Sequence, residues 1–107
     1  MSDRLSQLEK LHAADPNDPF VTYGIALEHG KAGAFDTALD WLDRTLAIDR
    51  TYCYAYYQKA KMHSELGDDA KARAVLNEGI AVARQAGGPD AAHAAEEMGQ
   101  LLTELDG

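Results

Sequence analysis

The amino-acid sequence predicts an all-α fold, built as a right-handed stack of antiparallel helical hairpins with about six helices. Residue types recur at a spacing of 34 residues, apolar side chains follow helical spacing, and glycines or prolines separate the segments. A repeat of this length is typical of stacked hairpins, which bury their apolar faces against one another. The recurring pairs are Ala26 and Ala60, His29 and His63, Gly33 and Gly67, Ala38 and Ala72, and Leu42 and Leu76.

The first helix is predicted over residues 3–14, with Ser2 as its N-cap. Its apolar stripe comprises Leu5, Leu8 and Leu11. A turn follows, in which Pro16 ends the first helix. Pro19 suits the first position of the second helix, after an Asp18 cap.

Glycines end three of the remaining helices. The second helix is predicted to end before Gly33, the fourth before Gly67, and the fifth before the Gly87-Gly88-Pro89 break. Turns this short force consecutive helices to lie antiparallel. The predicted ranges of the second to sixth helices are 19–32, 35–49, 52–66, 69–86 and 90–105.

The repeated residues resemble the tetratricopeptide repeat family, whose pattern is Trp-x2-Leu-Gly-x2-Tyr, then Ala-x3-Phe, then Pro. The matches are the small residues Ala26, Ala60, Ala38 and Ala72, the apolar Leu42 and Leu76, and the turn glycines Gly33 and Gly67. The family's Trp position holds Thr22 and then Tyr56, and its Tyr position holds His29 and then His63.

The resemblance implies one domain over residues 1–107. Residues 1–18 form an N-terminal half repeat, 19–52 and 53–86 form two full repeats, and 87–107 form a C-terminal capping helix. Two full repeats are fewer than a solenoid usually needs for a continuous core. We therefore expect the flanking helices to cover the exposed ends.

The charge of the chain excludes several kinds of partner. The formal net charge is −8. Residues 1–50 contain nine acidic and five basic residues, residues 51–86 contain four acidic and five basic residues, and residues 87–107 contain five acidic residues and no basic one. We expect no nucleic-acid partner and no membrane partner, because phosphate and anionic lipid both require a basic surface. With no secretory signal and a single cysteine, the chain is expected to be cytoplasmic.

The resemblance also implies a binding surface. In the family, the first helix of each hairpin lines a concave groove, and the matching positions here are Phe20, Tyr23, Leu27, Tyr54, Tyr57 and Lys61. Tyrosine suits such a surface because its ring offers apolar area and its hydroxyl a polar tip. The alternative is that these rings pack between hairpins, and Tyr56, in the Trp position, is expected in the core.

No residue pattern predicts an enzyme, a metal site or a cofactor. His29 and His63 share one repeat position, so we expect them to lie too far apart to bind one metal ion. Cys53 lacks a His and Asn at the spacing of a thiol nucleophile, and no phosphate-binding loop occurs.

The leading functional hypothesis is a non-catalytic module that binds a protein partner, as a peptide or helical segment, in the concave groove. Residues 51–86 are the least acidic part of the chain, so an acidic or neutral apolar segment is the expected ligand. The alternative is a self-assembling, homodimeric scaffold that pairs through its last helix. The apolar stripe of that helix comprises Ala91, Ala94, Ala95, Met98, Leu101, Leu102 and Leu105.

Overall fold

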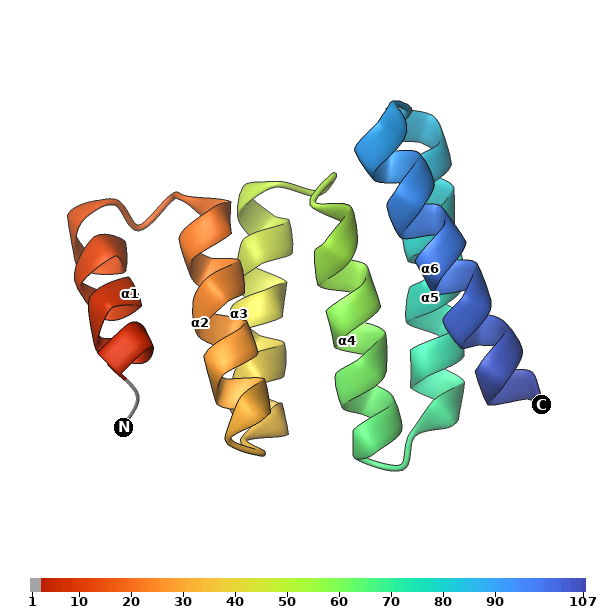
Figure 1. Cartoon of the computed structure of the whole chain (residues 1–107), viewed down its shortest axis with the longest axis horizontal. Coiled ribbons are helices and arrows are strands. Elements are labelled where there is room, and N and C mark those ends of the chain that lie inside the picture. The colour runs from red at the N-terminus through yellow and green to blue at the C-terminus, as the bar shows by residue number, and fades with distance from the viewer. Residues whose placement is uncertain (1–2) are drawn as a thin grey trace. The chain divides into compact units, whose positions relative to one another are not determined.

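The computed structural model describes residues 3–107, and these residues form helices and turns with no strand (Figure 1). The six helices are α1 (Asp3–Ala14), α2 (Pro19–Lys31), α3 (Phe35–Ile48), α4 (Cys53–Glu65), α5 (Asp69–Ala86) and α6 (Pro89–Asp106). The predicted all-α class is confirmed, and each helix begins and ends within one residue of its predicted range. The predicted cap Ser2 lies outside the described residues.

The helices fall into two compact units, divided between Arg50 and Thr51. The first unit holds α1 to α3, with α2 packed against both α1 and α3. The second holds α4 to α6, with α5 packed against α4 and α6, and α6 also against α4 (Figure 1). Short turns make α2 and α3 one antiparallel hairpin, and α4 and α5 another.

Aspartate side chains cap two of the helices. The carboxylate of Asp18 accepts a hydrogen bond of 3.0 Å from the backbone N–H of Phe20, and Pro19 occupies the first turn of α2 as predicted. The carboxylate of Asp68 accepts a bond of 3.1 Å from the backbone N–H of Lys71 at the start of α5. These caps satisfy backbone donors that the first turn of a helix leaves unpaired.

The two hairpin turns share one conformation. Gly33 has φ +80° and Gly67 has φ +81°, which confirms the predicted left-handed turns. In the first turn the N–H of Ala34 donates to the carbonyl of His29, and in the second the N–H of Asp68 donates to the carbonyl of His63, both at 2.9 Å. This bonding pattern closes the C-terminus of α2 and of α4 in the same way.

The core of the first unit lies between its three helices. Leu8, Val21 and Ile25 are buried together, and Leu5 and Trp41 pack against them. Ala26, Ala38 and Leu42 are also fully buried at the α2–α3 contact. The repeat positions that the sequence assigns to hairpin packing therefore lie in the core.

A pair of buried hydroxyl groups also joins α2 and α3. The side-chain oxygens of Thr22 and Thr45 lie 2.8 Å apart, and both residues are fully buried. Each oxygen also lies near a carbonyl of its own helix, at 3.1 Å from Pro19 and 2.9 Å from Trp41. Both hydroxyls are thus hydrogen-bonded, which burial requires. Thr22 holds the family's Trp position in the sequence, and in the structure its hydroxyl is hydrogen-bonded to that of Thr45.

In the core of the second unit, side chains of two neighbouring helices pack tightly against a glycine of α5. A Cβ atom added to Gly79 would lie 2.6 Å from the Cβ of Tyr56 on α4 and 2.7 Å from the Sδ of Met98 on α6. Tyr56 is only 3% exposed, which confirms that it belongs to the core. Gly79 therefore lets three helices meet. The other core side chains of this unit include Ala55, Ala60, Ala72, Leu76 and Ala94.

Candidate functional site

The six residues predicted to line a groove form two sets, one in each unit. Phe20, Tyr23 and Leu27 lie on α2, and Tyr54, Tyr57 and Lys61 lie on α4. Each set has the spacing of one helical face. The two sets belong to different units.

The α2 set is partly accessible. The side chain of Phe20 is 64% exposed at the start of α2, and Tyr23 and Leu27 are half-buried further along the helix. Leu11, at the end of α1, is 55% exposed. Phe20 is therefore not a core residue, and Tyr23 and Leu27 are only partly covered.

The α4 set forms a continuous column of contacts, called here the tyrosine column (Tyr54, Tyr57 and Lys61). The ring centroids of Tyr54 and Tyr57 are 6.4 Å apart and meet edge to face, at an interplanar angle of 83°. The Nζ atom of Lys61 lies 5.4 Å from the ring centroid of Tyr57. This distance is within the range of a cation–π interaction. Both tyrosines are half-buried, and Lys61 is exposed.

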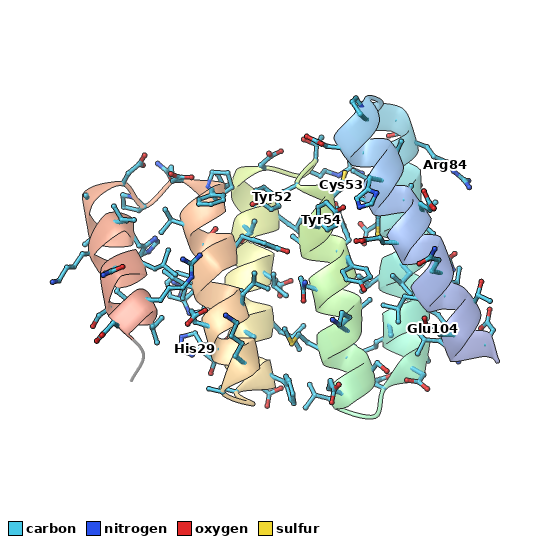
Figure 2. The ribbon with its side chains drawn as sticks, viewed as in Figure 1. His29, Tyr52, Cys53, Tyr54, Arg84 and Glu104 are labelled. Carbon is cyan, nitrogen blue, oxygen red and sulfur yellow. The ribbon has the colours of Figure 1, made fainter. Side chains whose placement is uncertain are left out.

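Helix α6 lies beside the tyrosine column. The ring centroids of Tyr54 and His93 are 6.3 Å apart, and the Nε2 atom of His93 lies 3.4 Å from the Oε1 atom of Glu97. Figure 2 shows Tyr54 on α4 and Glu104 further along α6. The column is therefore partly covered within its own unit, which explains why its rings are neither fully exposed nor fully buried.

The carboxylates of α6 affect the ionisation of both tyrosines. Burial raises the pKa of Tyr54 most, followed by the negative charges of Glu97 and Asp90 and by the hydrogen bond that its hydroxyl donates to Glu97. Burial also raises the pKa of Tyr57, with further increases from Glu97 and Glu104. Both phenols therefore stay protonated at neutral pH and act as hydrogen-bond donors beside negative charge.

Sequence reasoning missed the contribution of α6 to this site. His93 carried no signal in the sequence, and the helical spacing of Glu97 indicated only a solvated face of the last helix. Helical spacing groups Asp90, Glu97 and Glu104 along one side of α6. It does not show that this side lies next to the tyrosines of α4.

A second aromatic cluster in the first unit was also missed. The ring centroids of His12 on α1 and Trp41 on α3 are 5.0 Å apart at 83°, and the Cζ atom of Arg44 lies 4.3 Å from the ring centroid of Trp41. Within residues 3–107, the buried Nδ1 atom of His12 lacks a hydrogen-bond partner. This cluster ties α1 to α3 by ring packing, alongside the apolar contacts of Leu5 and Leu8.

No three His, Cys, Asp or Glu side chains between residues 3 and 107 gather closely enough to hold a metal ion. His29 and His63 belong to different units. The thiol of Cys53 donates a hydrogen bond of 3.2 Å to the carbonyl of Thr51. No helix in this part of the chain has the length and apolar character needed to cross a membrane.

Comparison with known sequences identifies one family. The sequence profile described as anaphase-promoting complex subunit 5 matches residues 20–97, which is most of the chain. No protein of curated function matches the chain.

Several solved structures are similar to this chain. A tetratricopeptide repeat domain protein from Salinibacter ruber is 28% identical, with 85% of this chain and 89% of that chain covered and a TM-score of 0.76. PcrH of Pseudomonas aeruginosa was solved in complex with the chaperone-binding region of PopD. It is 20% identical, the match covers 95% of this chain and 75% of that chain, and the TM-score is 0.85. The Yersinia enterocolitica type III secretion translocator chaperone SycD is 16% identical. The match covers 95% of this chain and 69% of that chain, with a TM-score of 0.84. These similarities confirm the tetratricopeptide-like repeat fold.

Proposed function

We propose, on the premise that this chain belongs to the anaphase-promoting complex subunit 5 family, that it is a non-catalytic interaction module for a peptide or helical segment of a protein partner. The tyrosine column is the observation that carries the proposal. It presents two half-buried tyrosines and an exposed lysine along one face of α4. Tyrosine is enriched at protein interfaces, where it supplies apolar area with little loss of conformational entropy.

The similar structures support a protein-binding role. PcrH is described in complex with the chaperone-binding region of PopD, so one protein of this fold binds a segment of another protein. Phe20, Tyr23 and Leu27 on α2 are proposed as a second contact set, because they hold the repeat positions that correspond to the column. The exposure of Phe20 supports their inclusion.

The proposal includes no catalytic step and no cofactor. The polar groups at the tyrosine column and beside it include a histidine–carboxylate pair and two phenols that stay protonated at neutral pH. None of these is a side-chain nucleophile paired with a general base, which is the arrangement typical of covalent catalysis. A cytoplasmic location stays a prediction from the single cysteine, and cell fractionation tests it.

Site-specific cross-linking tests the binding surface. Peptides are first selected from a random display library on the intact chain, and a photoreactive phenylalanine then replaces Tyr57. The matched control carries the same photoreactive residue at Ala81, which is exposed on α5. We expect selected peptides to cross-link from position 57 and not from position 81. Cross-links that form mainly from position 81 would place the binding surface elsewhere and contradict the proposal.

Self-assembly through α6 is the second candidate function. Ala91, Ala94 and Met98 in the first part of α6 are buried within the second unit. Further along, Leu101, Leu102 and Leu105 are only half-buried. A SycD structure is described as an alternative dimer, so self-association occurs in a protein of this fold. Sedimentation at rising concentration separates the two functions, because a monomer throughout favours peptide binding and a stable dimer favours assembly.

A further inference from the structure

The charge around the tyrosine column differs from the charge expected from its own sequence segment. Residues 51–86, which contain the column, have five basic and four acidic residues, and this balance favoured an acidic or neutral ligand. Residues 87–107 contain five acidic residues and no Lys or Arg. They form α6, which packs against α4. The carboxylates of α6 therefore contribute to the charge of this surface.

Three of these carboxylates form one stripe. Asp90, Glu97 and Glu104 follow one another at seven-residue spacing, so they lie along one side of α6. The middle one, Glu97, is 3.4 Å from His93, whose ring lies 6.3 Å from that of Tyr54. The Glu97 side chain remains 37% exposed. We call Asp90, Glu97 and Glu104 the carboxylate stripe, and it runs beside the tyrosine column.

The other charged groups of the unit leave this surface acidic. The Nη1 atom of Arg73 on α5 lies 3.9 Å from the Oδ1 atom of Asp106, a carboxylate that is not part of the stripe. Lys59 is two residues from both Tyr57 and Lys61, so it does not share their face of α4. The surface therefore combines the three carboxylates of the stripe with the ammonium group of Lys61.

Resting on the proposed function, we infer that the tyrosine column and the carboxylate stripe together bind a basic segment of the partner protein. Lys or Arg side chains of that segment lie over the tyrosine rings and beside the carboxylates of α6. Aromatic faces and carboxylates both attract cations, and together they favour basic partners over acidic ones. The hydroxyl of Tyr54 also donates a hydrogen bond to the carboxylate of Glu97, which positions both groups.

Lys61 takes a different role in this arrangement from the one that the sequence predicts. Its ammonium group lies 5.4 Å from the centroid of Tyr57, which shows that the ring face accepts a cation. A basic partner is repelled by Lys61 and competes with it for that face. Lys61 is therefore a residue that weakens binding of a basic segment, whereas it strengthens binding of an acidic one.

Two synthetic amphipathic peptides test the inference with the intact chain. They share one leucine-rich face, and one carries Lys and Arg where the other carries Glu. Binding of each labelled peptide is followed by fluorescence anisotropy. We expect the basic peptide to bind about tenfold more tightly than the acidic one, and added salt to weaken it. Tighter binding of the acidic peptide overturns the inference.

Charge variants then localise the effect. The double variant Glu97→Gln with Glu104→Gln removes two charges from the carboxylate stripe. It is expected to lower the affinity for the basic peptide about tenfold. Glu78→Gln with Glu96→Gln removes the same charge from exposed positions outside the stripe, and an effect below about twofold is expected. Equal losses in the two double variants would show that only the overall acidity of the chain matters, which contradicts the inference.

The variant Lys61→Gln is expected to change the affinity for basic and acidic peptides in opposite directions. We expect it to strengthen binding of the basic peptide about threefold, because it removes a competing cation; weaker binding overturns the inference. If the acidic peptide binds best and depends on Tyr57, the proposed function stands and this inference fails. If neither these peptides nor the display library yields a ligand, the proposed function fails, and the inference fails with it. Circular dichroism confirms that each variant folds.

Discussion

Gly79→Ala is expected to destabilise the second unit although alanine favours helices. Replacing an interior helical glycine by alanine usually gains about 1 kcal/mol. Here the added Cβ would lie 2.6 Å from the Cβ of Tyr56 and 2.7 Å from the Sδ of Met98. The Met98 side chain adapts easily, but the Cβ of Tyr56 is attached directly to the backbone of α4. Helices α4 and α5 must therefore move apart.

The net effect follows from two opposing contributions. Overpacking a core costs about 1–3 kcal/mol, and the contact with Tyr56 places Gly79 at the upper end of this range. Subtracting the helix-propensity gain of about 1 kcal/mol leaves a loss of roughly 1–2 kcal/mol in the free energy of unfolding. For a domain of this size, each kcal/mol lowers the melting temperature by about 4–8 °C.

Gly99→Ala on α6 is the matched control. A Cβ added to Gly99 would meet no atom within 4 Å, so the helix-propensity gain is unopposed. We expect Gly99→Ala to stabilise the chain by about 0.5–1 kcal/mol. Urea denaturation followed by far-ultraviolet circular dichroism measures both variants. If Gly79→Ala proves as stable as Gly99→Ala, the three helices do not meet as closely as argued, and the reasoning is refuted.

Three further predictions concern two substitutions and the ionisation of the two column tyrosines. Gly67→Val should lower the free energy of unfolding by more than about 1 kcal/mol, because a β-branched residue is strained at positive φ; an unchanged urea midpoint would contradict this. Ala60→Leu should cost about 1–3 kcal/mol, since Ala60 is fully buried; a normal melting temperature would show that space remains there. The phenols of Tyr54 and Tyr57 should ionise above the ordinary pKa of 10.0 in a titration followed by tyrosinate absorbance. Because their folded-state pKa values are raised, their contribution to stability is complete below pH 10 and is lost as the pH rises beyond it. Ionisation of these two residues at or below pH 10 would refute the burial and charge argument.

The helices and turns of this chain follow from its sequence because their determinants are local. Asp18 and Pro19 define the start of α2 through a side-chain cap and a fixed backbone angle. Gly33 and Gly67 define the hairpin turns because only glycine adopts positive φ without strain. Each of these effects acts within a few residues, and the 34-residue repeat shows the glycine turn twice.

Part of the candidate site is also predictable from sequence. Tyr54, Tyr57 and Lys61 share one face of α4 because of their spacing, and the observed ring contacts follow from that placement. Periodicity alone left open whether the rings were groove or core. In the structure they are half-buried, because α6 covers one side of them.

The surroundings of these residues were decided only by tertiary packing. Glu97 lies about forty residues beyond Tyr54 in the chain, and its position next to the tyrosines depends on how α6 crosses α4 and α5. The same holds for Gly79, whose contact with Tyr56 sets the distance between two helices. Helical periodicity shows which side chains share a face, but the helix that covers this face is selected by packing and charge between residues far apart in the sequence. The sequence alone therefore determined the helices and the tyrosine column, whereas the acidic character of the surface around that column was decided by the tertiary structure.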